Sequence, residues 1–216
     1  MAGASPELSP HPAQVKAALR REILARRDTV DPAVRARLSA AAIARVVSLR
    51  AFRQARVALA YASFGSELDT RALLRQMLDG GRTLVLPRVE RAARRLALHQ
   101  VRDLDRDLQP GTWGIPEPAP DRCRPVLPAE IDFVLVPGVA FDHHGGRVGH
   151  GSGYYDRLLA AWPPPVPSLV AAAFELQVVP AVPVLPTDRR VDLVVTESRT
   201  YPLLAPEPPQ DSQEGP

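Results

Sequence analysis

The stretch GGRVGHGSGYYDR, from Gly145 to Arg157, combines a bare backbone with side chains that can bind an anion. It holds five of the protein's 13 glycines. Successive amides of such a loop can converge on an anion, and a following helix N-terminus adds about half a positive charge. Arg147 and His150 add cations for phosphate, and Asp156 offers a carboxylate for Mg²⁺. The pattern favours phosphate binding, with a flexible turn as the alternative.

The glycine spacing matches neither of two common nucleotide-binding motifs. Counted from Gly146, the Walker spacing reaches Gly151 but then meets Ser152 and Gly153 in place of a lysine and a hydroxyl residue. The dinucleotide fingerprint requires a glycine at position 154, which is a tyrosine. The glycine pattern therefore predicts a site that binds an anion, but it does not identify which nucleotide, if any, carries that anion.

A second pair of cations lies near the N-terminus. Lys16 is the only lysine among 27 basic residues, and Arg20 follows it by one helical turn. Like charges at this spacing repel by a few tenths of a kcal/mol, and an anion between them would remove that cost. A site that needs a compact ammonium would explain why this lysine is not arginine. The alternative is a solvated basic helix face.

Apolar periodicity predicts a three-layer α/β/α domain with a mostly parallel central sheet, which would position these groups. Ligands of such sheets bind in loops at the carboxyl ends of strands, and the glycine stretch directly follows one predicted strand. We expect helices over 14–27, 31–46, 69–78 and 154–162. We expect strands over 56–62, 83–87, 132–137, 168–174 and 191–195, and an edge hairpin at 96–101.

Length and composition favour one domain over residues 13–201. Residues 1–12 and 202–216 are rich in Pro, Ser, Gln and Glu, and we expect them to be disordered tails. No apolar run reaches the roughly 18 residues that a membrane span needs, and the start lacks the apolar segment of a signal peptide. The single cysteine, Cys123, cannot form an internal disulfide. We therefore expect a cytoplasmic protein with no membrane partner.

The net charge of +3 raises the question of nucleic acid. Acidic residues interrupt the arginines along the whole chain, and aromatic residues are only 5% of the sequence. No basic stripe with interleaved stacking rings is visible, so we expect no nucleic-acid partner.

The order of several segments resembles the 5-formyltetrahydrofolate cyclo-ligase family, also called methenyltetrahydrofolate synthetases. The segments lie between Gln14 and Glu197 and read, in order, VKAALRR, YASFGSELDT, LPRV, WGIPEP, LVPGVAFDHHGGRVGHGSGYYDRLL and TDRRVDLVVTE. The long fifth segment is highly specific, whereas LPRV alone is not. The resemblance implies a scaffold similar to that of sugar-phosphate isomerases and coenzyme A transferases. It also implies ATP- and Mg²⁺-dependent cyclisation of 5-formyltetrahydrofolate to 5,10-methenyltetrahydrofolate, with release of ADP and phosphate.

The resemblance further implies roles for individual residues. Catalytic roles fall on Lys16, Arg20 and Arg147, and ATP binding falls on these three with Gly149, His150, Gly151, Ser152, Gly153, Tyr154 and Tyr155. Substrate binding falls on Glu67, Trp113 and Tyr154, and Mg²⁺ on Asp156 and Asp188. Two positions depart from the family pattern: Ser152 stands where some members have lysine, and Thr187 precedes Asp188 where histidine is usual.

The residues themselves leave alternatives to these roles. A carboxylate such as Glu67 suits the paired N–H donors on a pterin edge, but it also suits the N-terminus of the helix expected after Asp69. Trp113 could stack on folate, or it could be a core residue or a loop anchor. We expect His143 and His144 to be loop residues, because the implied reaction needs no protein base.

Three other functions stay open from the sequence. A sugar-phosphate isomerase or coenzyme A transferase-like enzyme would use the same scaffold. A non-catalytic folate or nucleotide binder would keep the site and lose turnover. An arginine-rich RNA-binding protein would bind with steep salt dependence. The GYYDR segment with the upstream Lys16 and Arg20 favours a nucleotide, and we expect a monomer or dimer that acts on small molecules.

Overall fold

The structure is a computed structural model and describes residues 11–185 and 188–202. The helices are α1 (Pro12–Asp28), α2 (Pro32–Ser48), α3 (Arg50–Gln54), α4 (Arg71–Asp79) and α5 (Tyr154–Ala160), with 3₁₀ turns η1 (Thr112–Gly114), η2 (Pro128–Glu130) and η3 (Glu175–Gln177). The strands are β1 (Val57–Leu59), β2 (Thr83–Glu90), β3 (Arg95–Val101), β4 (Leu108–Pro110), β5 (Pro116–Pro118), β6 (Phe133–Leu135), β7 (Ala140–Phe141), β8 (Arg147–Val148), β9 (Ser168–Ala172), β10 (Leu193–Val195) and β11 (Thr200–Pro202).

The central sheet has the strand order β11-β10-β9-β6-β1-β2-β3. The inner pairs are parallel, and the two edge strands β11 and β3 run antiparallel to their neighbours. β2, the next strand along the chain, pairs with β1 on one side, and β6, much later in the sequence, pairs with β1 on the other side. The predicted α/β class with a mostly parallel sheet is confirmed, and β6 and β1 flank the topological switch point where such sheets bind ligands.

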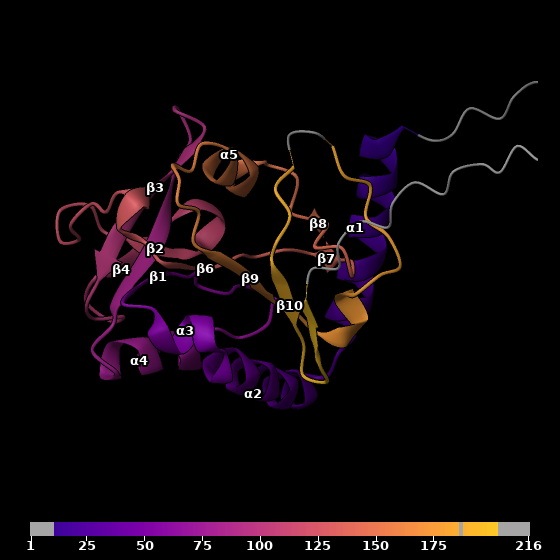
Figure 1. Cartoon of the computed structure of the whole chain (residues 1–216), viewed down its shortest axis with the longest axis horizontal. Helices are drawn as coiled ribbons and strands as arrows, with labels where there is room; N and C mark the ends of the chain where they lie inside the picture. The colour runs from indigo at the N-terminus through magenta and orange to yellow at the C-terminus, as the bar shows by residue number, and fades with distance from the viewer. Residues whose placement is uncertain (1–10, 186–187, 203–216) are drawn as a thin grey trace, which may run out of the picture.

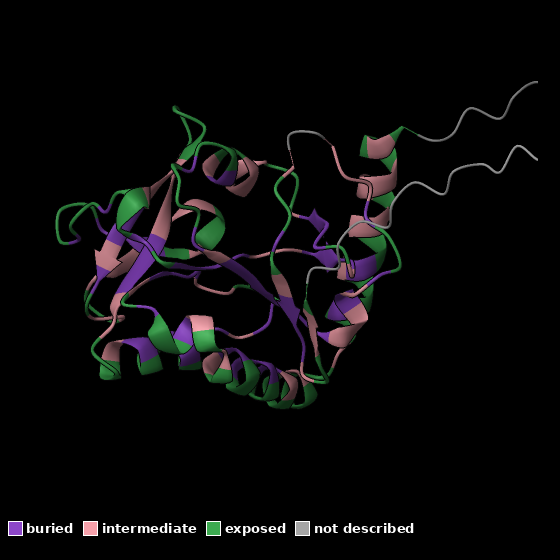
Figure 2. Ribbon diagram, in the orientation of Figure 1, coloured by how far each residue is buried: buried purple, intermediate pink, exposed green. Residues whose placement is uncertain are grey.

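Helices cover both faces of this sheet, and α1 stands beside it (Figure 1). On one face α2, α3 and α4 bury apolar side chains such as Val46, Phe52 and Met77 against the sheet. The fully buried Phe52 meets Phe133 of β6 edge to face, with ring centroids 5.4 Å apart. On the other face Leu159 of α5 packs in a second apolar cluster. Figure 2 shows that buried residues follow the central strands and the inward sides of the helices.

Helix α1 packs away from the two sheet faces. Its fully buried Ile23 contacts a third cluster that includes Val139, Ala140 and Val148, around the β7–β8 hairpin. The second strand of this hairpin, β8, lies inside the glycine stretch 145–157, where we expected no strand, and its Arg147 and Val148 pair with Phe141 and Ala140 of β7. The packing of α1 on the hairpin therefore brings the N-terminal cations to the glycine loop.

Several boundaries differ from the predicted ones. Helix α1 begins at Pro12, since the His11 imidazole accepts a hydrogen bond from the Ala13 amide at 3.3 Å and proline suits the first helical position. At the other end β11 extends the sheet to Pro202. The remainder of both expected tails, and Thr187, lie outside the described residues.

Helix α2 begins as predicted: the Asp31 carboxylate accepts from the Ala33 and Val34 amides at 2.8 and 3.1 Å. No helix in the described part of the chain combines the length and the hydropathy that crossing a bilayer requires.

Candidate active site

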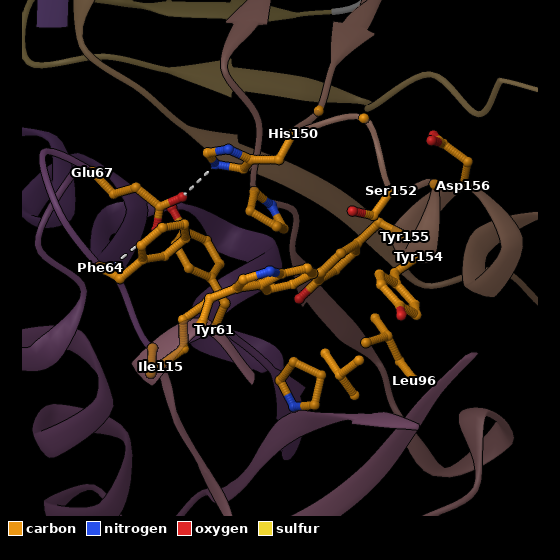
Figure 3. A pocket seen from close by; sticks show the side chains of 18 of the residues that line it. Tyr61, Phe64, Glu67, Leu96, Ile115, His150, Ser152, Tyr154, Tyr155 and Asp156 are labelled. Carbon is orange, nitrogen blue, oxygen red and sulfur yellow. Dashed lines mark hydrogen bonds and ion pairs between the residues drawn. The ribbon is translucent and has the colours of Figure 1, made fainter. Parts of the chain in front are cut away.

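A cavity of about 660 Å³ opens at the carboxyl ends of β1 and β6. Tyr61 and Glu67 enter it from the loop after β1, and Pro137 enters it just after β6. The loop from Gly149 to Gly153 forms another wall, and Tyr154 to Asp156 at the start of α5 continue it (Figure 3). The cavity thus lies at the switch point of the sheet, and the predicted site residues other than Asp188 are among those that line it.

Arg20 ties helix α1 to the glycine loop. Its Nε donates to the carbonyl oxygen of Gly149 at 2.7 Å. Its guanidinium also lies against Gly151, where an added Cβ would be 3.4 Å from the Arg20 Cζ. Gly151 has φ +101°, which side-chain-bearing residues rarely adopt. The backbone angle therefore favours glycine at this position, whereas an added Cβ would make only an ordinary van der Waals contact with Arg20.

Arg147 and Asp156 form an ion pair below the loop. The Arg147 side chain is 4% exposed and that of Asp156 is 36% exposed. Arg147 also donates from Nη1 to the carbonyl oxygen of Pro137 at 3.2 Å, whereas its buried Nε has no hydrogen-bond partner among the described residues. Asp156 stands in the first turn of α5. The predicted phosphate cation and the predicted Mg²⁺ ligand are thus neighbours.

The same relation holds for Lys16 and Asp188. The two side chains form an ion pair and are 14% and 15% exposed. The Asp188 carboxylate also accepts from the Leu185 amide at 2.7 Å. Although Asp188 does not line the cavity itself, its partner Lys16 does.

The carboxylates fit an ion that needs few protein ligands. In the described residues no cluster of three or more His, Cys, Asp or Glu side chains has a metal-binding arrangement. Mg²⁺ is usually held by one or two carboxylates together with phosphate oxygens and water. Asp156 and Asp188, each beside a cation that can turn to phosphate, suit that mode of binding.

Glu67 is a buried acid on the opposite wall, with 7% of its surface exposed. Its Oε2 accepts from the Phe64 amide at 3.1 Å, and its Oε1 lies 3.0 Å from Nε2 of His150. The buried guanidinium of Arg27 is close by: burial lowers the pKa of Arg27, and the charge of Glu67 opposes that shift. The Arg71 amide at the start of α4 donates to Asp69 at 2.9 Å, whereas the hydrogen bonds of Glu67 join it to Phe64 and His150.

An aromatic side chain stands at the mouth of the cavity. Trp113 is 59% exposed and has φ +59°, an unusual angle for a bulky residue. Its ring meets Tyr154 edge to face at 6.4 Å. The buried Glu117 holds the turn, since its Oε1 accepts from the Thr112 amide at 3.1 Å. Trp113 is therefore not a core residue, and the Arg91 guanidinium lies over its ring, 5.8 Å from the ring centroid.

Two tyrosines present neutral hydroxyl groups inside the cavity. Burial raises the pKa of Tyr61 well above its usual value, and the charge of Glu67 acts in the same direction. Burial also raises the pKa of Tyr155, against the opposing charge of Arg147. The buried Tyr155 hydroxyl has no hydrogen-bond partner among the described residues. It is therefore a buried polar group that stays unsatisfied within the described residues.

Sequence reasoning missed the apolar part of the site. Leu86 and Val89 of β2, Leu96 of β3 and Phe64 after β1 all line the cavity. They lie within the segments LPRV, LALHQV and YASFGSELDT, and none of the four was predicted as a site residue. A signal was available, because LPRV and YASFGSELDT are also segments of the family resemblance. As expected, His143 and His144 are not among the residues that line the cavity.

Fold and site together define a class of protein: an α/β scaffold with a cleft that combines a cationic glycine loop with an aromatic, acidic pocket. Such a cleft suits a phosphorylated ligand and a planar heterocycle side by side.

Comparison with known proteins identifies the family. The model of the 5-formyltetrahydrofolate cyclo-ligase family matches residues 12–197, and the chain belongs to this family. The Escherichia coli 5-formyltetrahydrofolate cyclo-ligase is 31% identical over 177 residues, which cover 82% of this chain and 97% of the relative. A probable 5-formyltetrahydrofolate cyclo-ligase of Caenorhabditis elegans is 28% identical over 174 residues, covering 76% and 84%.

Solved structures agree with this assignment. The Aquifex aeolicus 5,10-methenyltetrahydrofolate synthetase superposes with a TM-score of 0.77 at 32% identity, covering 93% of this chain and 98% of the other. A 5,10-methenyltetrahydrofolate synthetase from Mycoplasma pneumoniae shares the fold, with a TM-score of 0.68 at 21% identity and coverage of 84% and 98%. The resemblance seen in the sequence motifs is confirmed.

Proposed function

We propose that this protein catalyses the ATP- and Mg²⁺-dependent closure of 5-formyltetrahydrofolate to 5,10-methenyltetrahydrofolate, with release of ADP and phosphate. The observation that carries the proposal is that one cavity is lined both by the cations Lys16, Arg20 and Arg147 and by the buried acid Glu67. Both reactants are small molecules and would meet in this cavity. A formamide oxygen is a poor leaving group, so the reaction needs the phosphate donor next to the folate.

The folate half of the site is built around Glu67. A carboxylate with two free lone-pair positions can accept both N–H groups on the edge of a pterin ring. The apolar side chains of Leu86, Val89 and Leu96 offer a wall for the flat ring. Trp113 and Tyr154, at the mouth, are placed to contact the remainder of the substrate.

The nucleotide half is built from the glycine loop and the cations around it. Lys16, Arg20 and Arg147 would contact the ATP phosphates, and the amides of the loop would complete the cradle. Asp156 and Asp188 would hold Mg²⁺, which neutralises charge on phosphate oxygens when bound. Lys16 and Arg147 are now paired with Asp188 and Asp156, and on binding they would exchange these carboxylates for phosphate, so each charge would stay compensated.

In this reaction the terminal phosphoryl group of ATP passes to the formyl oxygen and ADP leaves. Nitrogen 10 of the substrate then attacks the activated formyl carbon, phosphate departs with the former formyl oxygen, and nitrogen 10 loses its proton. The protein contributes position and charge compensation, which are the main terms in phosphoryl transfer. No protein nucleophile is required.

Near-ultraviolet absorbance of the methenyl product tests the proposal. The purified protein is mixed with 5-formyltetrahydrofolate, ATP and Mg²⁺, and ATP is omitted in a parallel sample. We expect the chromophore to appear only with ATP. If both ligands bind and no product forms, the protein is a non-catalytic binder; if neither binds, an isomerase-like or transferase-like activity on the same scaffold replaces the proposal.

A further inference from the structure

One side chain of the glycine loop reaches across the cavity. His150 lies 83 positions after Glu67 in the sequence, yet its Nε2 is 3.0 Å from the Glu67 Oε1. Figure 3 shows the two side chains pointing toward each other from opposite walls, with Phe64 beside them. The contact joins the nucleotide half of the proposed site to the folate half.

Both ends of this contact are held in place. On the folate side, the Phe64 amide donates to the other Glu67 oxygen at 3.1 Å, and the Phe64 ring lies 5.3 Å from the imidazole of His150. On the nucleotide side, the preceding Gly149 carbonyl accepts from Arg20 at 2.7 Å. His150 is therefore one residue from a contact of a proposed phosphate-binding cation.

The contact leaves room for a ligand on Glu67. The two oxygens of a carboxylate offer about four lone-pair positions. His150 and the Phe64 amide occupy one position on each oxygen. A position remains on each oxygen for a pair of ligand N–H groups, so the imidazole can stay bound while the ligand is present.

We propose that His150 is a positioning residue that couples the two halves of the site, an inference that rests on the proposed function. A folate bound to Glu67 fixes the orientation of the carboxylate, and the carboxylate fixes His150. The imidazole in turn orders the loop from Gly149 to Gly151 against Arg20. Since coupling between two ligands is reciprocal, folate should tighten nucleotide binding by the same factor by which nucleotide tightens folate binding.

Binding calorimetry of a non-hydrolysable ATP analogue with Mg²⁺, with and without 5-formyltetrahydrofolate, measures this coupling. In the wild type we expect folate to raise nucleotide affinity by a factor of about 5 to 150. His150→Phe keeps a flat ring against Phe64 and removes the donor, so the factor should fall at least about fivefold. The coupling factor is the ratio of the nucleotide affinities of one variant with and without folate, so the loss of a phosphate contact of His150 itself, which would weaken both affinities equally, leaves the factor unchanged.

Two further variants separate hydrogen bonding from shape. His150→Gln keeps an N–H donor that can reach Glu67 and should restore most of the coupling. His144→Ala removes an exposed imidazole that does not line the cavity and should couple like the wild type. If His150→Phe does not fold, as judged by its thermal transition, His150→Ala takes its place in the comparison.

The outcomes distinguish this inference from the proposed function. Wild-type coupling in His150→Phe would overturn the role of His150, as would an equal loss of nucleotide affinity with and without folate. A wild-type protein that forms the methenyl product but shows no coupling would also overturn it and leave the proposed function standing. Absence of product formation in the wild type counts against the proposed function instead.

Discussion

Replacement of Asp156 by asparagine tests the ion pair with Arg147 and the proposed Mg²⁺ site in one variant. Asparagine keeps the shape and one acceptor oxygen but removes the negative charge. Arg147, with 4% of its side chain exposed, would keep the Pro137 carbonyl at 3.2 Å and the neutral amide oxygen as partners. Its positive charge would then be buried without a compensating charge.

The expected loss of stability follows from these exposures. Two unit charges about 4 Å apart attract by about 4 kcal/mol at an effective dielectric constant of about 20. Removal of one member of a fully buried pair costs about 3 to 5 kcal/mol. The Asp156 side chain is 36% exposed, so solvent screens part of the interaction. We expect the free energy of unfolding to fall by about 2 kcal/mol, or about 4 to 8 °C in Tm for a domain of this size.

Activity should fall by a larger factor than stability explains. Loss of a metal ligand or an electrostatic contact in the transition state costs at least about 10²-fold in kcat. Urea unfolding and the absorbance assay measure the two effects on the same sample. Asp121→Asn is the matched control, because its 70% exposed side chain lies 3.8 Å from Arg122 on the surface and its loss should stay within about 0.5 kcal/mol.

Two results would refute this reasoning. Full activity of Asp156→Asn with lowered stability would show that Asp156 is a partner of Arg147 and not a ligand of Mg²⁺. Unchanged stability would show that the charge of Arg147 does not need Asp156 in the folded protein.

Three further predictions concern the same cavity. Lys16→Arg keeps a cation beside Asp188 and should change the free energy of unfolding by less than about 1 kcal/mol, yet lower kcat about 10²-fold; equal activity would contradict the role of the ammonium. ATP should bind at least about tenfold more weakly without Mg²⁺ in calorimetry, because Lys16 and Arg147 then stay paired with Asp188 and Asp156; equal affinity would contradict the exchange of partners. Tyr155→Phe removes a buried hydroxyl without a described partner and should stay within about 1 kcal/mol of the wild type at neutral pH in urea unfolding. Burial raises the pKa of Tyr155 in the folded state, so its contribution to the free energy of unfolding is present below the unfolded pKa of about 10 and is lost as the pH rises through the folded pKa. Tyr155→Phe should therefore lose less stability than the wild type above pH about 10. An equal loss of stability in the two proteins would contradict this.

Local sequence patterns predicted most elements of the fold. The Asp31–Pro32 start of α2 and the apolar runs that became β6, β9 and β10 depend on neighbouring residues alone. The β7–β8 hairpin and β11 were missed, because strands of two and three residues are too short to show a periodic pattern and form only by pairing with a neighbouring strand.

The candidate site shows a similar division. Motif order brought Lys16, Glu67, Trp113 and the glycine loop to attention, and the structure places them around one cavity. The apolar wall from β2 and β3 was not predicted, because a strand pattern does not tell whether a buried face meets another side chain or a ligand.

The sequence by itself determined the α/β class and the family, because periodicity and motif order are properties of the chain. Only the tertiary structure decided which charges meet. Lys16 pairs with Asp188 across 172 positions, and His150 meets Glu67 across 83. Which of these charges meet depends on the order of the strands in the sheet and on where α1 packs. The attraction acts over a few ångströms in space, so the positions of two charges along the chain do not predict that they pair.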